Sequence, residues 1–154
     1  MSKYSLIVFD WDGTVIDSKK KIVECMQISI SSLGHPKRTD KEVADIIGLG
    51  LDAAVASLYP DFSTSDVKKL AQFYRETSLI QETKSQLFEG VEEVLSSLKN
   101  DGYDLAVATG KSRRGLDKDL IDTGLAEFFP ISRCADETRS KPNPQMMELS
   151  LIHI

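Results

Sequence analysis

The pattern of apolar and polar positions divides the chain into two kinds of segment. Two short, uninterrupted apolar runs, at residues 6–9 and 105–108, are typical of strands that are covered on both faces of a parallel sheet. Between them, from about residue 17 to residue 86, apolar side chains recur at helical spacing. Helices are also expected before and after the second run, followed by a weak strand at residues 129–134 and a last helix.

The long middle segment reads as four helices and shows no alternation typical of a strand. Gly34, Gly48 and Pro60 mark the ends of the first three helices. Thr39 and Glu42 have the spacing of a capping box, which predicts that the second helix begins there. The segment is therefore expected to be helical throughout.

The order of the elements predicts an α/β fold with an insertion. A strand, helix and strand after residue 86 are typical of a parallel sheet, and the helical block is too large to be a simple crossover. We therefore expect a Rossmann-like parallel sheet core formed by residues 1–16 and 87–154. Residues 17–86 are expected to form a separate helical domain.

Both apolar runs end in side chains that carry oxygen. Asp10 and Asp12 follow the first run and Thr109 follows the second. The carboxyl ends of parallel strands meet at one edge of a sheet, where open α/β folds bind their ligands. Two carboxylates so close together favour a bound cation, and Mg²⁺ is the simplest cation for a site of oxygen ligands. An ordinary turn remains the alternative, because Asp and Gly are common after strands.

Two further features add to this candidate site. Lys141 precedes Pro142-Asn143-Pro144, a stiff turn that would fix the direction of its stem. Asp10 and Asp12 supply a nucleophilic carboxylate and a second carboxylate, and Thr109 supplies a hydroxyl. Together with the cation of this lysine, they are the groups that phosphoryl transfer needs. Gly48-Leu49-Gly50 separates two helices and is either an ordinary helix end or a loop that closely approaches a site.

Composition narrows the class of protein. With 154 residues, 41% hydrophobic and 28% charged, the chain is long and apolar enough for one globular domain with a sizeable core. A net charge of -5 gives no reason to expect nucleic-acid binding, and the apolar runs are too short for a membrane span. The cysteines, Cys25 and Cys134, and the histidines, His35 and His153, lack metal or redox spacing. With no obvious secretory signal, a cytoplasmic protein is expected. The sequence does not indicate an oligomeric state.

In these motifs the chain resembles the haloacid dehalogenase-like (HAD) hydrolase superfamily, in its phosphoglycolate phosphatase-like branch with a helical cap. Asp10-Trp11-Asp12-Gly13-Thr14 resembles the first family motif, and Ala108-Thr109-Gly110-Lys111 the second. Lys141-Pro142-Asn143-Pro144 resembles the third. The helical block matches the cap in position and size, so the resemblance extends over about residues 4–148.

The resemblance implies a Mg²⁺-dependent hydrolase that removes phosphate from a small phosphorylated metabolite through an aspartyl-phosphate. Asp10 would be the nucleophile and a Mg²⁺ ligand. Asp12 would act as acid and base, with its main-chain carbonyl on the metal. Thr109 would donate to the phosphoryl group, and Lys141 would orient Asp10. The substrate-binding residues implied by the resemblance are Thr14, Gly48, Leu49, Gly50 and Gly110.

One family motif is missing from the sequence. The fourth motif, an acidic turn after another strand, supplies the remaining Mg²⁺ carboxylates in the family. We therefore expect a fragment truncated before that motif, in which residues 149–154 depart from the usual helix. The first strand is central in the family, so it is expected here to have an unpaired edge and an exposed apolar face. Mg²⁺ binding is expected to be weaker than in a complete relative.

Other activities remain open at this point. A phosphosugar mutase of the same fold also uses both aspartates, whereas a dehalogenase does not need the second one. A phosphonate hydrolase would need a cap lysine, for which residues 19–21 are the candidates. The missing fourth motif also leaves open a catalytically inactive fragment or binding module.

Overall fold

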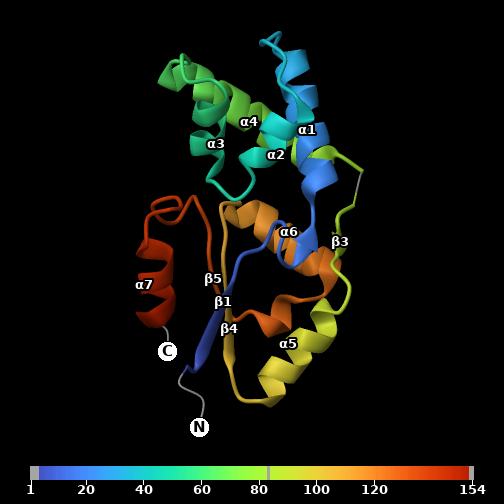
Figure 1. Ribbon diagram of the computed structural model, residues 1–154, viewed down its shortest axis with the longest axis vertical. Helices are drawn as coiled ribbons and strands as arrows, with labels where there is room; N and C mark the ends of the chain where they lie inside the picture. The colour runs from blue at the N-terminus through green and yellow to red at the C-terminus, as the bar shows by residue number, and fades with distance from the viewer. Residues whose placement is uncertain (1–3, 83, 153–154) are drawn as a thin grey trace.

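The main sheet has three parallel strands in a computed structural model that describes residues 4–82 and 84–152 (Figure 1). The strand order is β1 (Leu6–Phe9), β4 (Asp104–Ala108), β5 (Ile131–Arg133). The apolar residues of the central strand β4 are all buried, as its continuous apolar run predicts. The structure thus confirms the expected α/β fold with a parallel sheet. Residues 1–3, 83 and 153–154, which include His153 and parts of the expected domain ranges, lie outside the described residues.

Helices cover the sheet on both sides (Figure 1). α5 (Val91–Asn100) and α6 (Arg113–Thr123) contribute buried leucines to a hydrophobic cluster that also contains Leu105 and Val107 of β4. α7 (Gln145–Ile152) contacts β4 and β5 and lies on the other side of the sheet. A short 3₁₀ helix at Ala126–Phe128, which the sequence pattern did not predict, precedes β5.

A block of four helices lies at one end of the molecule, coloured blue to green in Figure 1. Its buried apolar side chains form a second hydrophobic cluster, distinct from that of the sheet. The predicted capping box is present, because the Thr39 main-chain N–H donates to the Glu42 carboxylate at 2.7 Å and Thr39 Oγ1 accepts from the Glu42 N–H at 3.2 Å. The four helices are α1 (Lys19–Ser32), α2 (Asp40–Asp45), α3 (Leu51–Leu58) and α4 (Thr64–Ile80).

The two connections between the sheet and the helical block pair with each other. β2 (Ile16–Asp17) and β3 (Gln86–Leu87) form a two-stranded antiparallel ribbon. The sequence pattern predicted only connections at these positions, because two residues are too few to show a strand alternation. The helical block therefore joins the sheet through a hydrogen-bonded ribbon.

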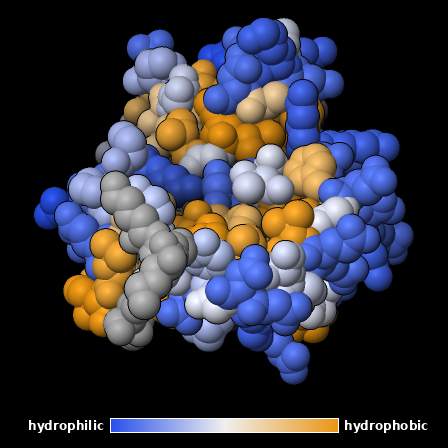
Figure 2. All heavy atoms as spheres, turned by 60° about the horizontal axis from the view of Figure 1, so that its bottom comes forward, coloured by the Kyte–Doolittle hydropathy of each residue, from blue (hydrophilic) through white to orange (hydrophobic). Residues whose placement is uncertain are grey.

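β1 lies at an edge of the sheet, as expected. Within the described residues its strand partner is β4. Its four apolar residues are all partly exposed, in contrast to the buried apolar residues of β4. Figure 2 shows a face of the molecule on which hydrophobic residues are exposed between hydrophilic ones. Such an edge can pair with another chain.

We expect the chain to self-associate through β1, and Val8→Lys to reduce that association. Ile7 and Phe9 pack against the hydrophobic cluster, so by strand alternation Val8 points away from it and a lysine there adds charge with little loss of packing. Sedimentation velocity over a concentration series should show a rising sedimentation coefficient for the wild type and a constant one for V8K. Ser97→Lys, on the exposed side of α5, is the matched control and should behave like the wild type. A wild type that stays monomeric at every concentration would contradict this expectation.

Candidate functional site

A buried tryptophan separates the two aspartates that follow β1. Trp11 is 0% exposed, and its ring packs edge-on against Phe129 with centroids 5.9 Å apart. Gly13 has φ +79°, a left-handed conformation that favours glycine and lets the chain turn back immediately. Because Trp11 enters the hydrophobic cluster, its neighbours Asp10 and Asp12 are left to face the cleft at this end of the sheet.

Asp10 is paired with the lysine that the sequence predicts. Lys141 Nζ lies 3.0 Å from Asp10 Oδ1, and the Trp11 main-chain N–H donates to the same oxygen at 2.7 Å. The loop that carries Lys141 is braced by the Asn143 N–H, which donates to the Ser140 carbonyl at 3.1 Å. The structure therefore brings the first and third motifs into direct contact.

Asp12 has a cation of its own, which the sequence reasoning missed. Lys111 Nζ lies 3.3 Å from Asp12 Oδ1 and 3.3 Å from Asp119 Oδ2. The indole N–H of Trp11 donates to the same Asp119 oxygen at 2.9 Å, and Ser18 Oγ donates to Asp12 Oδ1 at 2.6 Å. The available signal was that Lys111 is the last residue of the second motif and that Asp119 follows eight residues later, in the expected helix.

The charge of Lys111 is set by these neighbours. Burial alone would lower the pKa of Lys111, but the carboxylates of Asp12 and Asp119 outweigh it and hold this pKa above the ordinary lysine value. Burial also raises the pKa of Tyr74, an α4 residue whose electrostatic partners include Lys111. Lys111 is therefore a cation and Tyr74 a neutral phenol at neutral pH.

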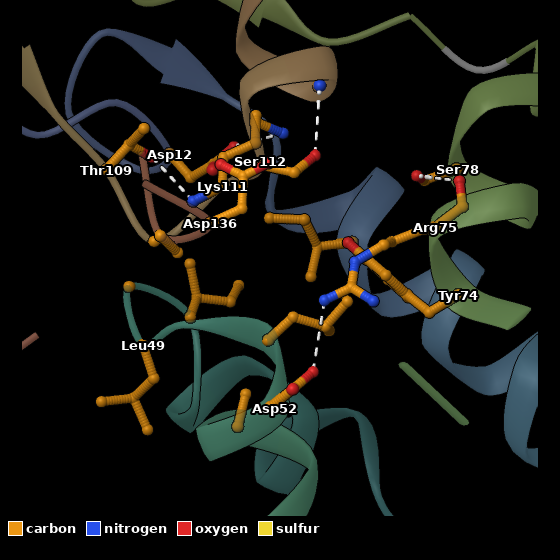
Figure 3. A pocket seen from close by; sticks show the side chains of 18 of the residues that line it. Asp12, Leu49, Asp52, Tyr74, Arg75, Ser78, Thr109, Lys111, Ser112 and Asp136 are labelled. Carbon is orange, nitrogen blue, oxygen red and sulfur yellow. Dashed lines mark hydrogen bonds and ion pairs between the residues drawn. The ribbon is translucent and has the colours of Figure 1, made fainter. Parts of the chain in front are cut away.

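A cleft of about 630 Å³ lies between the end of the sheet and the helical block (Figure 3). Asp10, Asp12 and Thr109 line it from the sheet side. Thr109 is 1% exposed, and its hydroxyl accepts a hydrogen bond from the Lys111 main-chain N–H at 3.1 Å. Gly48 and Leu49 line the cleft from the helical side, so residues distant in sequence meet at one cavity.

Four predicted features lie outside the cleft lining. Lys141 is one of them, although it contacts Asp10, which lines the cleft. Thr14 is exposed and does not line the cleft. Gly50 does not line it either, although it contacts the loop that precedes Lys141. The lysines at residues 19–21 are also outside the lining, so the structure does not place a lysine from that run at the site.

The loop at residues 48–50 packs directly against the second and third motifs. A Cβ on Gly110 would meet the main chain of Leu49, with its carbonyl carbon 2.7 Å away. A Cβ on Gly50 would meet the side chain of Ser140, with its Cβ 2.8 Å away. Of the two readings of this loop, the structure supports close approach to a site, and glycine permits that approach.

The carboxylates at the cleft offer a small donor set for a metal. Within residues 4–82 and 84–152, no group of three or more His, Cys, Asp or Glu side chains is placed to hold a metal ion. Mg²⁺ is often bound through one or two carboxylates together with substrate phosphate and water. The described contacts of the Asp10 side chain fall on Oδ1, and they leave Oδ2 for a ligand. Asp10 and Asp12 therefore fit a Mg²⁺ ion that keeps several non-protein ligands.

Comparison with known proteins identifies the family. Residues 7–153 match the haloacid dehalogenase-like hydrolase family over almost the whole chain. The chain belongs to this HAD hydrolase family. Membership agrees with the order of the three motifs, and with the ion pairs that join the first motif to the second and to the third.

Relatives of the chain carry phosphatase names. The "probable phosphatase IndB" of Dickeya dadantii is 32% identical over 152 residues, which cover 95% of this chain and 66% of that protein. The "phosphoglycolate phosphatase, plasmid" of Cupriavidus necator is 31% identical over 146 residues, covering 90% of this chain and 62% of that protein. The chain thus spans slightly less than two thirds of the length of both relatives.

A solved structure shows the same fold. That of a predicted phosphatase from Clostridium acetobutylicum superposes with a TM-score of 0.87 at 23% identity, covering 99% of this chain and 71% of that one. At this identity the likeness concerns the fold alone. No helix in the described part of the chain is long and apolar enough to cross a membrane.

We expect Gly50→Ala to lower the free energy of unfolding by about 1–3 kcal/mol, because the added methyl group overpacks the contact with Ser140. Ser140→Gly should rescue this variant, since it removes the obstructing side chain. Gly110→Ala should destabilise similarly but resist rescue, because its obstacle is the main chain of Leu49. Urea unfolding of the single and double variants measures the coupling. Equal stability of Gly50→Ala and the wild type would contradict the close approach.

The raised pKa of Tyr74 predicts a loss of stability at alkaline pH. The folded state keeps the phenol proton at a pH where the unfolded chain loses it, so the free energy of unfolding falls as the pH rises above about 10. Tyr74→Phe should make this fall less steep. Tyr4→Phe changes a tyrosine that is 67% exposed and should leave the slope as in the wild type. Urea unfolding at a series of alkaline pH values measures both slopes, and identical slopes would refute the prediction.

Proposed function

We propose that this chain carries the reacting groups of a Mg²⁺-dependent phosphatase that hydrolyses a small phosphomonoester through an aspartyl-phosphate. The observation that supports it best is the pairing of Asp10 with Lys141 and of Asp12 with Lys111 at a cleft that Thr109 also lines. Membership of the HAD hydrolase family and the phosphatase names of the relatives agree with it.

The two aspartates divide the reaction between them. Asp10 attacks the phosphorus, the bond from phosphorus to the ester oxygen breaks, and Asp12 gives a proton to that departing oxygen. A water molecule then attacks the phosphorus as Asp12 takes a proton from it. This second step releases inorganic phosphate and restores the carboxylate of Asp10.

The cations reduce the electrostatic cost of bringing a phosphate to these carboxylates. Lys141 orients Asp10 and offsets its charge at 3.0 Å, and Lys111 does the same for Asp12 at 3.3 Å. Thr109 and the Gly110 N–H donate to the phosphoryl oxygens. Mg²⁺, held by Asp10 and the main-chain carbonyl of Asp12, would neutralise further negative charge on the phosphate.

The helical block acts as a cap over this chemistry. Residues 17–86 form the cap, and residues 1–16 and 87–154 form the sheet core. The contact of Leu49 with Gly110 supports this arrangement, because it brings the cap loop onto the second motif. A closed cap excludes water from the ester and contacts its organic part. Cys25 and Cys134 are free, buried thiols, which agrees with a protein of the reducing cytoplasm.

The substrate class follows from the size and lining of the cleft. About 630 Å³ is within the usual range for small metabolites, about 300–1,000 Å³, and exceeds what a phosphate group alone occupies. The name of the Cupriavidus necator relative gives phosphoglycolate as the substrate of that protein. A small phosphorylated metabolite is therefore the proposed substrate.

Asp10→Asn tests the proposal, because an amide is a poor nucleophile. With Mg²⁺ and a generic phosphomonoester, the rate of phosphate release should fall by about 1,000-fold or more. Asp17→Asn makes the same change at an exposed aspartate outside the cleft lining and should keep the rate. Removal of Mg²⁺ with a chelator should also stop turnover.

Two outcomes would count against the phosphatase. Absence of Asp10-dependent phosphate release by the folded chain would indicate an inactive fragment or a binding module. Interconversion of sugar phosphate isomers without net phosphate release would indicate a mutase. Circular dichroism of each variant shows whether a lost rate reflects lost folding.

A further inference from the structure

The tryptophan between the two aspartates begins a chain of contacts that ends at Asp12. The indole N–H of Trp11 donates to Asp119 Oδ2, in the middle of α6, at 2.9 Å. Lys111 Nζ lies 3.3 Å from the same Asp119 oxygen and 3.3 Å from Asp12 Oδ1 (Figure 3). A fixed aromatic ring of the core is therefore joined to the proposed acid and base through two charged side chains.

Burial separates this group from the ion pairs on the surface of the same helix. The side chains of Lys111, Asp12 and Asp119 are 21%, 12% and 16% exposed. Those of the Lys118–Asp122 pair are 39% and 43% exposed. An exposed pair contributes little to stability, and a buried pair is often no more stabilising than apolar side chains of similar size. Stability alone therefore does not explain the buried charges.

The described contacts of the Asp12 carboxylate fall on one of its two oxygens. Lys111 Nζ and the Ser18 hydroxyl both contact Oδ1, at 3.3 Å and 2.6 Å. Oδ2 is left to exchange a proton with a molecule in the cleft that Asp12 lines. A general acid must come within about 2.6–3.2 Å of the atom that receives its proton. A carboxylate fixed through one oxygen is better placed to reach that distance with the other.

We propose that Asp119 is a positioning residue for proton transfer by Asp12. Anchored by the Trp11 indole, Asp119 holds Lys111 against Asp12 Oδ1, so that Oδ2 meets the ester oxygen as it departs. Asp119 does not line the cleft and acts through Lys111. This inference rests on the proposed function, because it concerns the step in which Asp12 gives up its proton.

Three esters with different leaving groups test this role: the phosphates of 4-nitrophenol, phenol and benzyl alcohol. They are similar in size, but the three alcohols are increasingly weak acids, so the departing oxygen depends increasingly on a proton from Asp12. The kcat/KM for phosphate release with Mg²⁺ reports the step that breaks the ester bond. A purely structural defect would lower all three values by the same factor.

Asp119→Asn keeps the shape of the side chain and removes the charge that holds Lys111. In this variant kcat/KM should fall by about 10- to 100-fold for benzyl phosphate and by less than about threefold for 4-nitrophenyl phosphate. Asp122→Asn is the matched control, because it neutralises an exposed aspartate of the same helix. It should keep kcat/KM for all three esters.

Lys111→Met should produce the same dependence on the leaving group as Asp119→Asn. Adding Asp119→Asn to Lys111→Met should not increase that dependence, since Asp119 acts through Lys111. The double variant loses one cation and one anion, so the balance of buried charge is kept. It therefore tests the role even if one of the single variants fails to fold, which circular dichroism would show.

The anchor can be followed separately from turnover. Trp11 is the single tryptophan of the sequence, so its indole N–H gives one signal in a ¹H–¹⁵N NMR spectrum. This signal should shift in Asp119→Asn, because the charged acceptor at 2.9 Å is lost, and it should keep its position in Asp122→Asn.

The outcomes separate this inference from the proposed function. Unchanged rates or equal losses for the three esters in Asp119→Asn would overturn the role of Asp119 and leave the phosphatase intact. Additive effects of Asp119→Asn and Lys111→Met, or an unshifted indole signal, would do the same. Absence of Asp10-dependent phosphate release from all three esters by the folded protein would overturn the proposed function, and with it the proton transfer assigned to this group.

Discussion

The burial of one aromatic ring determines how the site is assembled. Trp11 occupies the hydrophobic cluster between the sheet and α6. Its two sequence neighbours, Asp10 and Asp12, therefore both face the cleft. Its indole N–H also holds Asp119, which in turn holds Lys111 beside Asp12. Packing energy from a large buried side chain thus positions charged groups that would otherwise repel one another. The same residue is part of the core and part of the support of the site.

The aspartates and the lysines of the site follow different strands of the sheet. Lys111 follows β4 and Lys141 follows β5, while both aspartates follow β1. Parallel pairing in the order β1, β4, β5 brings these three strand ends together, so strand order determines which charges meet. Pairing each aspartate with a lysine lowers the cost of their proximity before any phosphate enters.

Much of the fold and of the site could be predicted from the sequence because the decisive signals are local. Residues 105–108 form an unbroken apolar run, and the structure buries them as the central strand. Asp10, Thr109 and Lys141 each end or follow a strand, so topology alone brings them to one edge. The contacts of Lys111 with Asp12 and Asp119 could not be predicted, because they depend on how α6 is rotated about its axis against Trp11, which the apolar periodicity does not specify. The strands β2 and β3 could not be predicted because two residues are too few to show an alternation of apolar and polar side chains. The exposed position of Thr14 could not be predicted either, because it depends on the turn at Gly13.

The ribbon of β2 and β3 gives the molecule a mechanical linkage. Ser18 is the residue between β2 and α1, and its hydroxyl donates to Asp12 at 2.6 Å. Any rotation of the helical block about the ribbon would therefore shift the hydroxyl that donates to this carboxylate. The angle between the block and the sheet and the orientation of the Asp12 side chain are thus linked through a single hydrogen bond.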